Sequence, residues 1–221
     1  MMTQRFADVV DRNNAFYRDK LRAHGPSPRG VDFNSPEAMT LRFAMLLRIR
    51  DDDAPFTVND YGCAYGALHD WMTARGWPFR YRGFDVSEEM IAHARRLHAG
   101  AANAEFVTDE ADLTPADFTV ASGLFNMPFG LPADAWLAHI HATLGRLAAL
   151  SRRGFAFNAL TVYSDPDRMR PDLYYADPTQ LFDFCKRTIS RRVALLHDYP
   201  LYDFTILVRT DPDRAAPGTA P

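Results

Sequence analysis

Apolar residues recur along this chain with two different spacings, and the two spacings alternate. Within residues 1–50 they recur every three or four positions, as on one side of an amphipathic helix, first over residues 4–23 and then from Ser35 to about Arg50. Further along, short apolar runs rich in Val, Phe and Tyr are separated by other amphipathic segments. The short runs predict strands at residues 56–60, 79–85, 104–108, 117–122, 154–160, 191–199 and 202–210.

Residues that favour the start of a helix precede several of the predicted helices. Ser35, Ser87 and Asp177 are favourable N-caps, and Ser35 and Asp177 are each followed by a proline that suits the first helical turn. Between residues 108 and 117 there is little room for a helix, so we expect a loop or a single turn there. The helices in this part of the chain are predicted at residues 66–76, 87–99, 132–150 and 177–188.

Strands that alternate with helices predict a mostly parallel sheet with helices on both faces. The last two strands follow each other closely and should form an antiparallel hairpin. The predicted fold class is therefore α/β, with seven strands and a terminal antiparallel hairpin. We divide the chain into an N-terminal helical lid over residues 1–50 and a core over residues 51–210. The polar tail, residues 211–221, is expected to be disordered.

A glycine turn follows the first predicted strand, which ends at Asp60. The turn has the spacing Gly62-x-Ala64-x-Gly66, and open α/β sheets bind ligands at such a place. A dinucleotide site would supply G-x-G-x-x-G for a pyrophosphate, which this spacing does not, and the carboxylate of Asp60 would repel that group. S-adenosylmethionine (SAM) carries no phosphate. Its ammonium group would be attracted by Asp60, directly or through water.

A second acid, Asp85, ends the second predicted strand, 19 residues after the last glycine of the turn. An acid in this place suits both hydroxyls of a ribose, a feature that NAD and SAM sites share. Together with a turn unsuited to phosphate, it favours SAM. Val86 and Met90 would flank the adenine, because methionine is a polarizable surface for an aromatic ring. Glu110 or Asp109 would meet the adenine amine.

The segments VNDYGCAYGAL and YRGFDVSEEMIAHAR resemble, in order and in spacing, the first and second motifs of class I SAM-dependent methyltransferases. SGLFNMPF, GFAFNALTVYSD and LYYADP further resemble small bacterial members of this family. The resemblance covers about residues 56–125 and implies a Rossmann-like sheet, SAM as methyl donor and S-adenosylhomocysteine (SAH) as product. The residues expected to bind the cofactor are Asp60, Gly62, Cys63, Ala64, Gly66, Asp85, Val86, Met90, Ser122, Gly123 and Tyr17.

Ala64 departs from the family motif, which is usually written D-x-G-C-G-x-G. Its methyl group adds bulk where the cofactor passes close to the backbone. A left-handed backbone at an alanine would cost about 1 kcal/mol or more. We therefore expect a negative φ at Ala64.

Methyl transfer from a sulfonium is a direct displacement that needs alignment, and a base where the acceptor loses a proton. The sequence offers no nucleophilic triad. Gly123 would permit close approach to the methionine end of SAM, Asn126 would orient a polar acceptor, and Tyr163 would line the acceptor pocket. Tyr17 would contact the methionine carboxylate or the acceptor. The alternatives are loop capping by Asn126, and packing by Tyr163 and Tyr17.

The charge of the chain is nearly balanced, with 25 basic and 28 acidic residues and a net charge of −3. This gives no electrostatic reason to expect nucleic acid, and 16 Phe and 9 Tyr favour an aromatic pocket for a small-molecule acceptor. Methylation of a protein or of RNA is one alternative. Another is a SAM-binding regulatory or partner protein without turnover.

The cysteines, Cys63 and Cys185, lie far apart, and no histidines have metal-binding spacing. We therefore expect neither a disulfide nor a metal site, and a reducing, cytoplasmic setting. The N-terminus lacks signal-peptide features, and no apolar run approaches the about 18 residues of a membrane span. The chain is expected to be a monomer or homodimer that binds no membrane. We place Arg42, Arg48 and His98 on the surface.

Overall fold

The structure is a computed structural model of the whole chain. It describes residues 2–210, apart from the side chains of residues 2–8 and 10, so the predicted disordered tail lies outside the described residues. The helices are α1 (Met2–His24), α2 (Pro36–Leu46), α3 (Ala67–Thr73), α4 (Glu88–Leu97), α5 (Ala133–Ala149) and α6 (Pro178–Phe184). The strands are β1 (Phe56–Tyr61), β2 (Phe79–Phe84), β3 (Ala104–Val107), β4 (Ala116–Ala121), β5 (Ser151–Leu160), β6 (Arg192–Leu196) and β7 (Asp203–Arg209).

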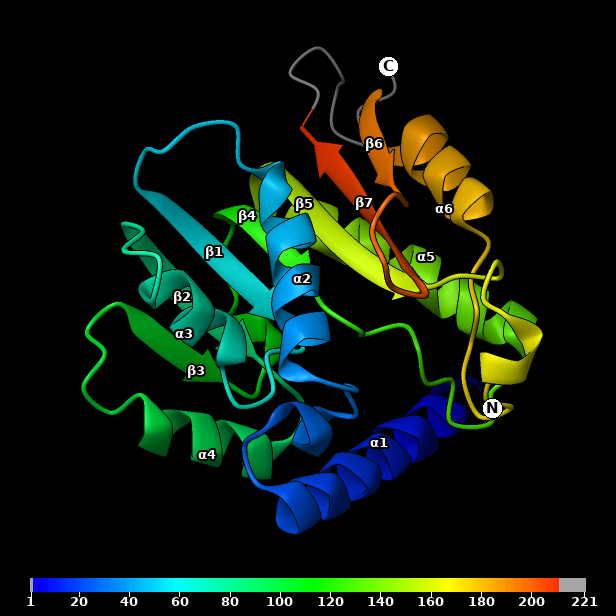
Figure 1. Cartoon of the computed structure of the whole chain (residues 1–221), viewed down its shortest axis with the longest axis horizontal. Helices are drawn as coiled ribbons and strands as arrows, with labels where there is room; N and C mark the ends of the chain where they lie inside the picture. Colours follow the sequence, from blue (N-terminus) through cyan, green and yellow to red (C-terminus); the bar gives the residue numbers. More distant parts are fainter. Residues whose placement is uncertain (1, 211–221) are drawn as a thin grey trace.

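The seven strands form one sheet in the order β3-β2-β1-β4-β5-β7-β6 (Figure 1). The pairs from β3 to β5 are parallel, and β7 is antiparallel to both β5 and β6. The predicted α/β sheet with a terminal antiparallel hairpin is therefore confirmed. The chain moves from β1 outward to β2 and β3, but from β4 in the opposite direction to β5. The carboxyl ends of β1 and β4 thus form the switch point at which such sheets bind ligands.

Helices cover both faces of the sheet and create two hydrophobic cores. α2, α3 and α4 pack on one face, where Leu46, Trp71 and Ile91 are buried. α5 and α6 cover the other face, where Ile140 and Leu181 are buried. α2 therefore belongs to the packed core, although it lies in the segment that we predicted to be a lid.

Local signals set the beginnings of the helices. Ser35 and Ser87 accept hydrogen bonds from the amides of Ala38 (3.1 Å) and Met90 (3.3 Å), as N-caps do. The ends are less regular. α2 stops at Leu46 and continues as a 3₁₀ turn, and α6 continues as a π-helical turn over Cys185–Ile189. The short connection before β4 holds only the 3₁₀ turn Glu110–Asp112, as predicted.

α1 lies across the end of the sheet to which β1 and β3 point (Figure 1). Val9, Asn13 and Tyr17 on this helix line a cavity that opens at the strand ends. α1 is thus the described helix that is placed to cover a ligand at the switch point. None of the helices described between residues 2 and 210 has the length and apolar character needed to cross a membrane.

Candidate active site

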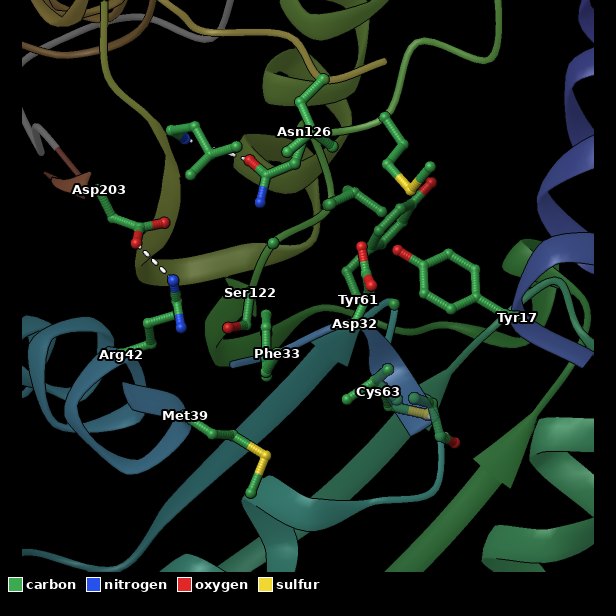
Figure 2. A pocket seen from close by; sticks show the side chains of 18 of the residues that line it. Tyr17, Asp32, Phe33, Met39, Arg42, Tyr61, Cys63, Ser122, Asn126 and Asp203 are labelled. Atoms are coloured by element: carbon green, nitrogen blue, oxygen red, sulfur yellow. Dashed lines mark hydrogen bonds and ion pairs between the residues drawn. The ribbon is translucent and has the colours of Figure 1, made fainter. Parts of the chain in front are cut away.

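A cavity of about 920 Å³ lies at the carboxyl ends of β1, β2 and β4, beneath α1 and the loop that joins α1 to α2 (Figure 2). Its volume is near the upper end of the range for small-molecule sites. Apart from the alternatives Glu110 and Asp109, we expected thirteen residues to bind the cofactor or the acceptor. Those that line the cavity are Tyr17, Asp60, Gly62, Cys63, Ala64, Asp85, Val86, Met90, Ser122, Gly123 and Asn126. The two that do not are Gly66 and Tyr163.

Hydrogen bonds connect the glycine turn to the end of β2. The amides of Gly62 and Cys63 both donate to the carbonyl of Phe84, at 2.8 and 2.9 Å. The amide of Ala64 donates to Oδ2 of Asp85 (2.9 Å), and the amide of Ser87 donates to Oδ1 of the same carboxylate (2.9 Å). Asp85 therefore holds two segments in place, and each oxygen keeps a lone pair for a ligand hydroxyl.

Ala64 has φ of 49°, in the left-handed region, so our expectation of a negative φ was wrong. The amide of Ala64 is bonded to Asp85, and two residues later the amide of Gly66 is bonded to the carbonyl of Cys63 (3.0 Å). The left-handed conformation of Ala64 lets the chain turn between these two bonds into α3. For an L-residue this conformation costs about 1–2 kcal/mol. The turn thus contains strain that a glycine would not have.

Gly66 lies beside the site but outside the cavity wall. It begins α3 with φ of 86°, and a β-carbon there would lie 2.8 Å from His98 and 2.9 Å from Phe106. These contacts are shorter than real β-carbons tolerate, so this position requires glycine for packing as well as for its backbone conformation. The motif placed Gly66 correctly in the turn, but its missing side chain makes room for two rings.

Asp60 is the buried acid of the site, with 4% of its surface exposed. Its Oδ2 accepts a hydrogen bond from the hydroxyl of Tyr81 at 2.7 Å. Burial, with a smaller contribution from the charge of Asp85, raises the pKa of Asp60 to about 7, although the hydrogen bond from Tyr81 opposes the shift. A cation in the cavity would favour the ionised form of this carboxyl.

Burial also raises the pKa of Asp85, and the amides of Ser87 and Ala64 oppose this effect. Beyond Asp85, Met90 is almost completely buried, at 1% exposure, whereas Val86 is 39% exposed. Both line the cavity, so they form one wall next to the second acid.

The two acids expected near the adenine do not line the cavity. Glu110 pairs with Arg146 at 3.1 Å, and Asp109 accepts a hydrogen bond from the amide of Ala111. Their proposed contact with an adenine amine stays a prediction.

The loop after β4 has a fixed orientation. The amide of Gly123, at φ of 68°, donates to Oδ1 of Asn158 at 2.7 Å. Oδ1 of Asn126 accepts from the amide of Leu160 at 3.1 Å, which leaves its NH₂ group on the cavity side (Figure 2). Because a backbone amide can only donate, this bond identifies which end of the Asn126 side chain is oxygen. Asn126 therefore presents a hydrogen-bond donor to the cavity.

Tyr163 is not part of the cavity wall, contrary to our prediction. After β5 the chain turns at Thr161, whose hydroxyl accepts a hydrogen bond from the amide of Tyr163. This turn directs the ring outward, where it is 66% exposed and lies 5.8 Å from the ring of His197. Acceptor contacts on this side of the cavity must come from other residues.

Tyr17 points into the cavity near Asp32, a residue that sequence reasoning missed (Figure 2). Burial raises the pKa of Tyr17 well above its usual value, and the charges of Asp32 and Asp85 add to this effect. Asp32 accepts from Lys20 (2.7 Å) and from Arg170 (3.1 Å). These bonds join α1, the loop after it and the loop after β5 at one side of the cavity.

Arg42 and Asp203 form a buried ion pair in the cavity wall, so the prediction of Arg42 at the surface was wrong. Nη2 of Arg42 lies 2.5 Å from Oδ2 of Asp203, and burial raises the pKa of that carboxyl while Arg42 opposes the effect. The two residues are 161 positions apart, so no local signal pointed to the pair. Arg48, on the same part of the chain, is exposed as predicted.

His98 is buried, not exposed, and lies with His69 and Asp70 in a cluster with the composition of a metal site. All four ring nitrogens in this cluster already have partners, and Nδ1 of His69 lies 3.5 Å from Oδ1 of Asp70. Nε2 of His98 contacts Asp70 (2.9 Å), Nδ1 of His98 contacts the carbonyl of Ala94 (2.8 Å), and Nε2 of His69 contacts Asn103 (3.2 Å). The cluster is therefore explained as a hydrogen-bond network that packs α3 against α4.

Comparison with known proteins agrees with this architecture. Residues 58–146 match the profile of a methyltransferase domain family. A protein of Mycobacterium tuberculosis named "Putative methyltransferase Rv1506c" is 55% identical to this chain over 163 residues, which is 74% of this chain and 98% of that protein.

Two solved structures share the fold at low sequence identity. The N-methyltransferase NodS of Bradyrhizobium japonicum WM9, in complex with SAH, gives a TM-score of 0.63 at 13% identity, over 89% of this chain and 97% of NodS. The magnesium protoporphyrin IX methyltransferase ChlM of Synechocystis PCC 6803, with bound SAM, gives a TM-score of 0.53 at 17% identity, over 76% of each chain. With the mycobacterial relative and the matching domain profile, these results show that the chain belongs to the class I SAM-dependent methyltransferases.

Proposed function

We propose that this enzyme binds SAM at the turn end of the cavity and transfers its methyl group to a small-molecule acceptor held beside Asn126. One observation carries the proposal. The two acids and the glycine turn occupy one end of a cavity that continues past Ser122 and Asn126 to the start of β7. The cavity therefore offers space for an acceptor next to the cofactor.

The residues at the turn fit the chemical groups of SAM. Asp85 has an oxygen lone pair available on each side for the ribose hydroxyls, while its amide partners keep it in place. Asp60 offers a buried carboxylate for the ammonium group. Val86 and Met90 supply apolar surface for the adenine. Gly62, with φ of 84°, lets the backbone approach the methionine moiety without a side chain.

SAM supplies an electrophilic methyl carbon on a sulfonium. The task of this chain is to hold the acceptor in line with that carbon and to exclude water. Asn126 donates a hydrogen bond to the acceptor from an amide that Leu160 has already oriented. Gly123 leaves room beside it, and α1 with Tyr17 acts as the lid over the cofactor.

The charges around the cavity favour a small molecule over RNA. Each arginine in the cavity wall has an acidic partner: Arg42 with Asp203, Arg146 with Glu110, Arg168 with Asp167, and Arg170 with Asp32 and Asp172. Phosphate binding requires cations that are available to the ligand. The paired arginines give the site no excess of positive charge. The buried, unpaired Cys63 and Cys185 fit a reducing compartment, and we assign the enzyme to the cytoplasm.

Calorimetric titration with SAM, SAH and NAD tests the proposal. We expect SAM and SAH to bind and NAD not to bind. Asp85→Ala should weaken SAH binding by about 100-fold, because two charge-assisted hydrogen bonds are lost. The control is Asp19→Ala, which removes an exposed carboxylate on α1 and should leave the affinity unchanged. Absence of SAH binding, or equal affinities in the two variants, would disprove the proposed site.

A further inference from the structure

The Arg42–Asp203 pair has features that a purely structural ion pair does not need. Arg42 is 6% exposed and Asp203 has no exposed surface, yet both residues line the cavity. The guanidinium and the carboxylate share one hydrogen bond, although an arginine fork can make two parallel bonds to a carboxylate. The pair is therefore buried but incompletely bonded.

Three polar atoms of the pair have no hydrogen-bond partner among the described residues. They are Nε and Nη1 of Arg42 and Oδ1 of Asp203. A buried polar atom without a partner destabilises the folded state, and apolar residues often replace buried ion pairs without loss of stability. Folding stability alone does not account for this pair. The three atoms have almost no accessible surface in the ligand-free protein, so a ligand bonds to them when the two side chains turn toward the cavity that they line.

The Arg42–Asp203 pair lies on the side of the cavity where we place the acceptor. The ring of Phe33 lies 4.7 Å from the guanidinium carbon of Arg42. The same ring is 3.0 Å from the point that a β-carbon on Gly123 would occupy. Figure 2 shows the pair on one side of the pocket, with Tyr17 and Cys63 on the other. The pair is thus separated from the Gly123 loop by one aromatic ring, away from the turn that we assign to the cofactor.

We propose that Arg42 and Asp203 form the subsite that recognises the methyl acceptor, and that the group bound there is neutral and both donates and accepts hydrogen bonds, as a hydroxyl or a carboxamide does. This inference rests on the proposed function. A group of this kind accepts from Arg42 and donates to Asp203. An anion would be repelled by Asp203, and a cation by Arg42, at close range in a dry site.

Four one-ring probes with the same apolar part test this selectivity. Benzamide, benzyl alcohol, benzoate and benzylammonium are titrated separately into the SAH-saturated protein, and their dissociation constants are measured by NMR. The neutral probes should bind at least about tenfold more tightly than the charged ones. Asp203→Asn should make benzoate the tightest probe, and Arg42→Met should make benzylammonium the tightest. Arg48→Met and Asp198→Asn, which remove exposed charges nearby, should keep the wild-type order.

The inference is overturned if a charged probe binds the wild type as tightly as benzamide, or if the order is the same in all variants. Where a single variant does not fold, Arg42→Met/Asp203→Leu replaces it. That double variant should bind SAH normally and lose the preference for benzamide over toluene; if it retains the preference, the inference is again overturned. The SAH titration is read separately, so failure of the cofactor site is distinguished from failure of the acceptor subsite.

Discussion

The two ends of the cavity are built in different ways. At the cofactor end, Asp60 and Asp85 come from neighbouring strands. Asp60 is held by the hydroxyl of Tyr81, and Asp85 is held by backbone amides of the turn and of Ser87. At the acceptor end, Arg42, Asn126 and Asp203 come from a helix, a loop and a strand that are far apart in sequence. The first end uses backbone geometry, which many sequences can supply. The second depends on individual side chains, so it is where members of one family would be expected to differ in acceptor.

The largest effect is expected at the acceptor end. Arg42→Met leaves the carboxylate of Asp203 buried without its partner, so the free energy of unfolding should fall by about 3–5 kcal/mol. Urea denaturation measures this change. Arg42→Met/Asp203→Leu should recover most of the loss, and Arg48→Met should remain within about 0.5 kcal/mol of the wild type. If Arg42→Met costs no more than Arg48→Met, the acceptor end does not rely on this pair.

The next largest effect is expected for Gly66 at the cofactor end, where a substitution should change the stability of the protein but not its affinity for SAH. Gly66→Ala places a β-carbon against His98 and Phe106 and keeps a left-handed backbone, so it should destabilise the protein by about 2–3 kcal/mol. SAH should bind the folded variant as it binds the wild type, because Gly66 does not line the cavity. Urea denaturation and calorimetry are the two measurements.

Gly76→Ala is the matched control for the packing effect. Gly76 also has a positive φ, 65°, but a β-carbon there meets no atom within 4 Å. Gly76→Ala should therefore lower the free energy of unfolding by only about 1 kcal/mol, because only the backbone conformation is unfavourable for alanine. Equal losses in the two variants would show that packing against His98 and Phe106 is unimportant.

The same contrast explains which features the sequence predicted. Ser35, Ser87 and Asp177 act on amides two or three residues away, so their effects are visible in the local sequence. The positions of Asp60 and Asp85 follow from strand ends, which alternating patterns locate well. The sheet with its terminal hairpin was predictable for the same reason.

Features that depend on distant partners were not predictable. The pairing of Arg42 depends on Asp203, which the fold brings to it from 161 residues away. The burial of His98 depends on its packing beneath Gly66, and the outward direction of Tyr163 depends on one turn at Thr161. For Arg42 and His98, contacts with other elements decided the outcome. For Tyr163 a local turn decided it, which the position of this residue after a strand does not reveal.

A smaller effect, about tenfold in affinity, is expected from the titration of Asp60. Its pKa is about 7, and only the ionised form attracts an ammonium group, so SAH should bind about tenfold more tightly at pH 8 than at pH 6. Calorimetry at the two pH values measures this difference. Asp60→Asn removes the titration, so its affinities at the two pH values should be nearly equal. A wild-type affinity independent of pH would argue against contact between Asp60 and the ammonium group.

The ligand-free protein should show the opposite trend in stability. Burial raises the pKa of Asp60 from its usual value near 4 to about 7, so the folded state holds this proton more tightly than the unfolded chain. The resulting contribution of Asp60 to the free energy of unfolding is fully present below about pH 4 and is lost as the pH rises through 7. Thermal melts should therefore show wild type losing stability relative to Asp60→Asn over this range.

The smallest effect concerns Ala64, the residue at which the cofactor end departs from its family motif. Its φ of 49° costs about 1–2 kcal/mol, whereas glycine adopts this conformation freely but loses more entropy on folding. Ala64→Gly should therefore raise the free energy of unfolding by about 0.5 kcal/mol, or 1–2 °C in Tm. Ala92→Gly, on the exposed side of α4, should change stability by a similar amount with the opposite sign. If both variants are destabilised, Ala64 is not in a strained conformation, although its amide is bonded to Asp85. The φ of Ala64 is then negative, as the sequence alone suggested.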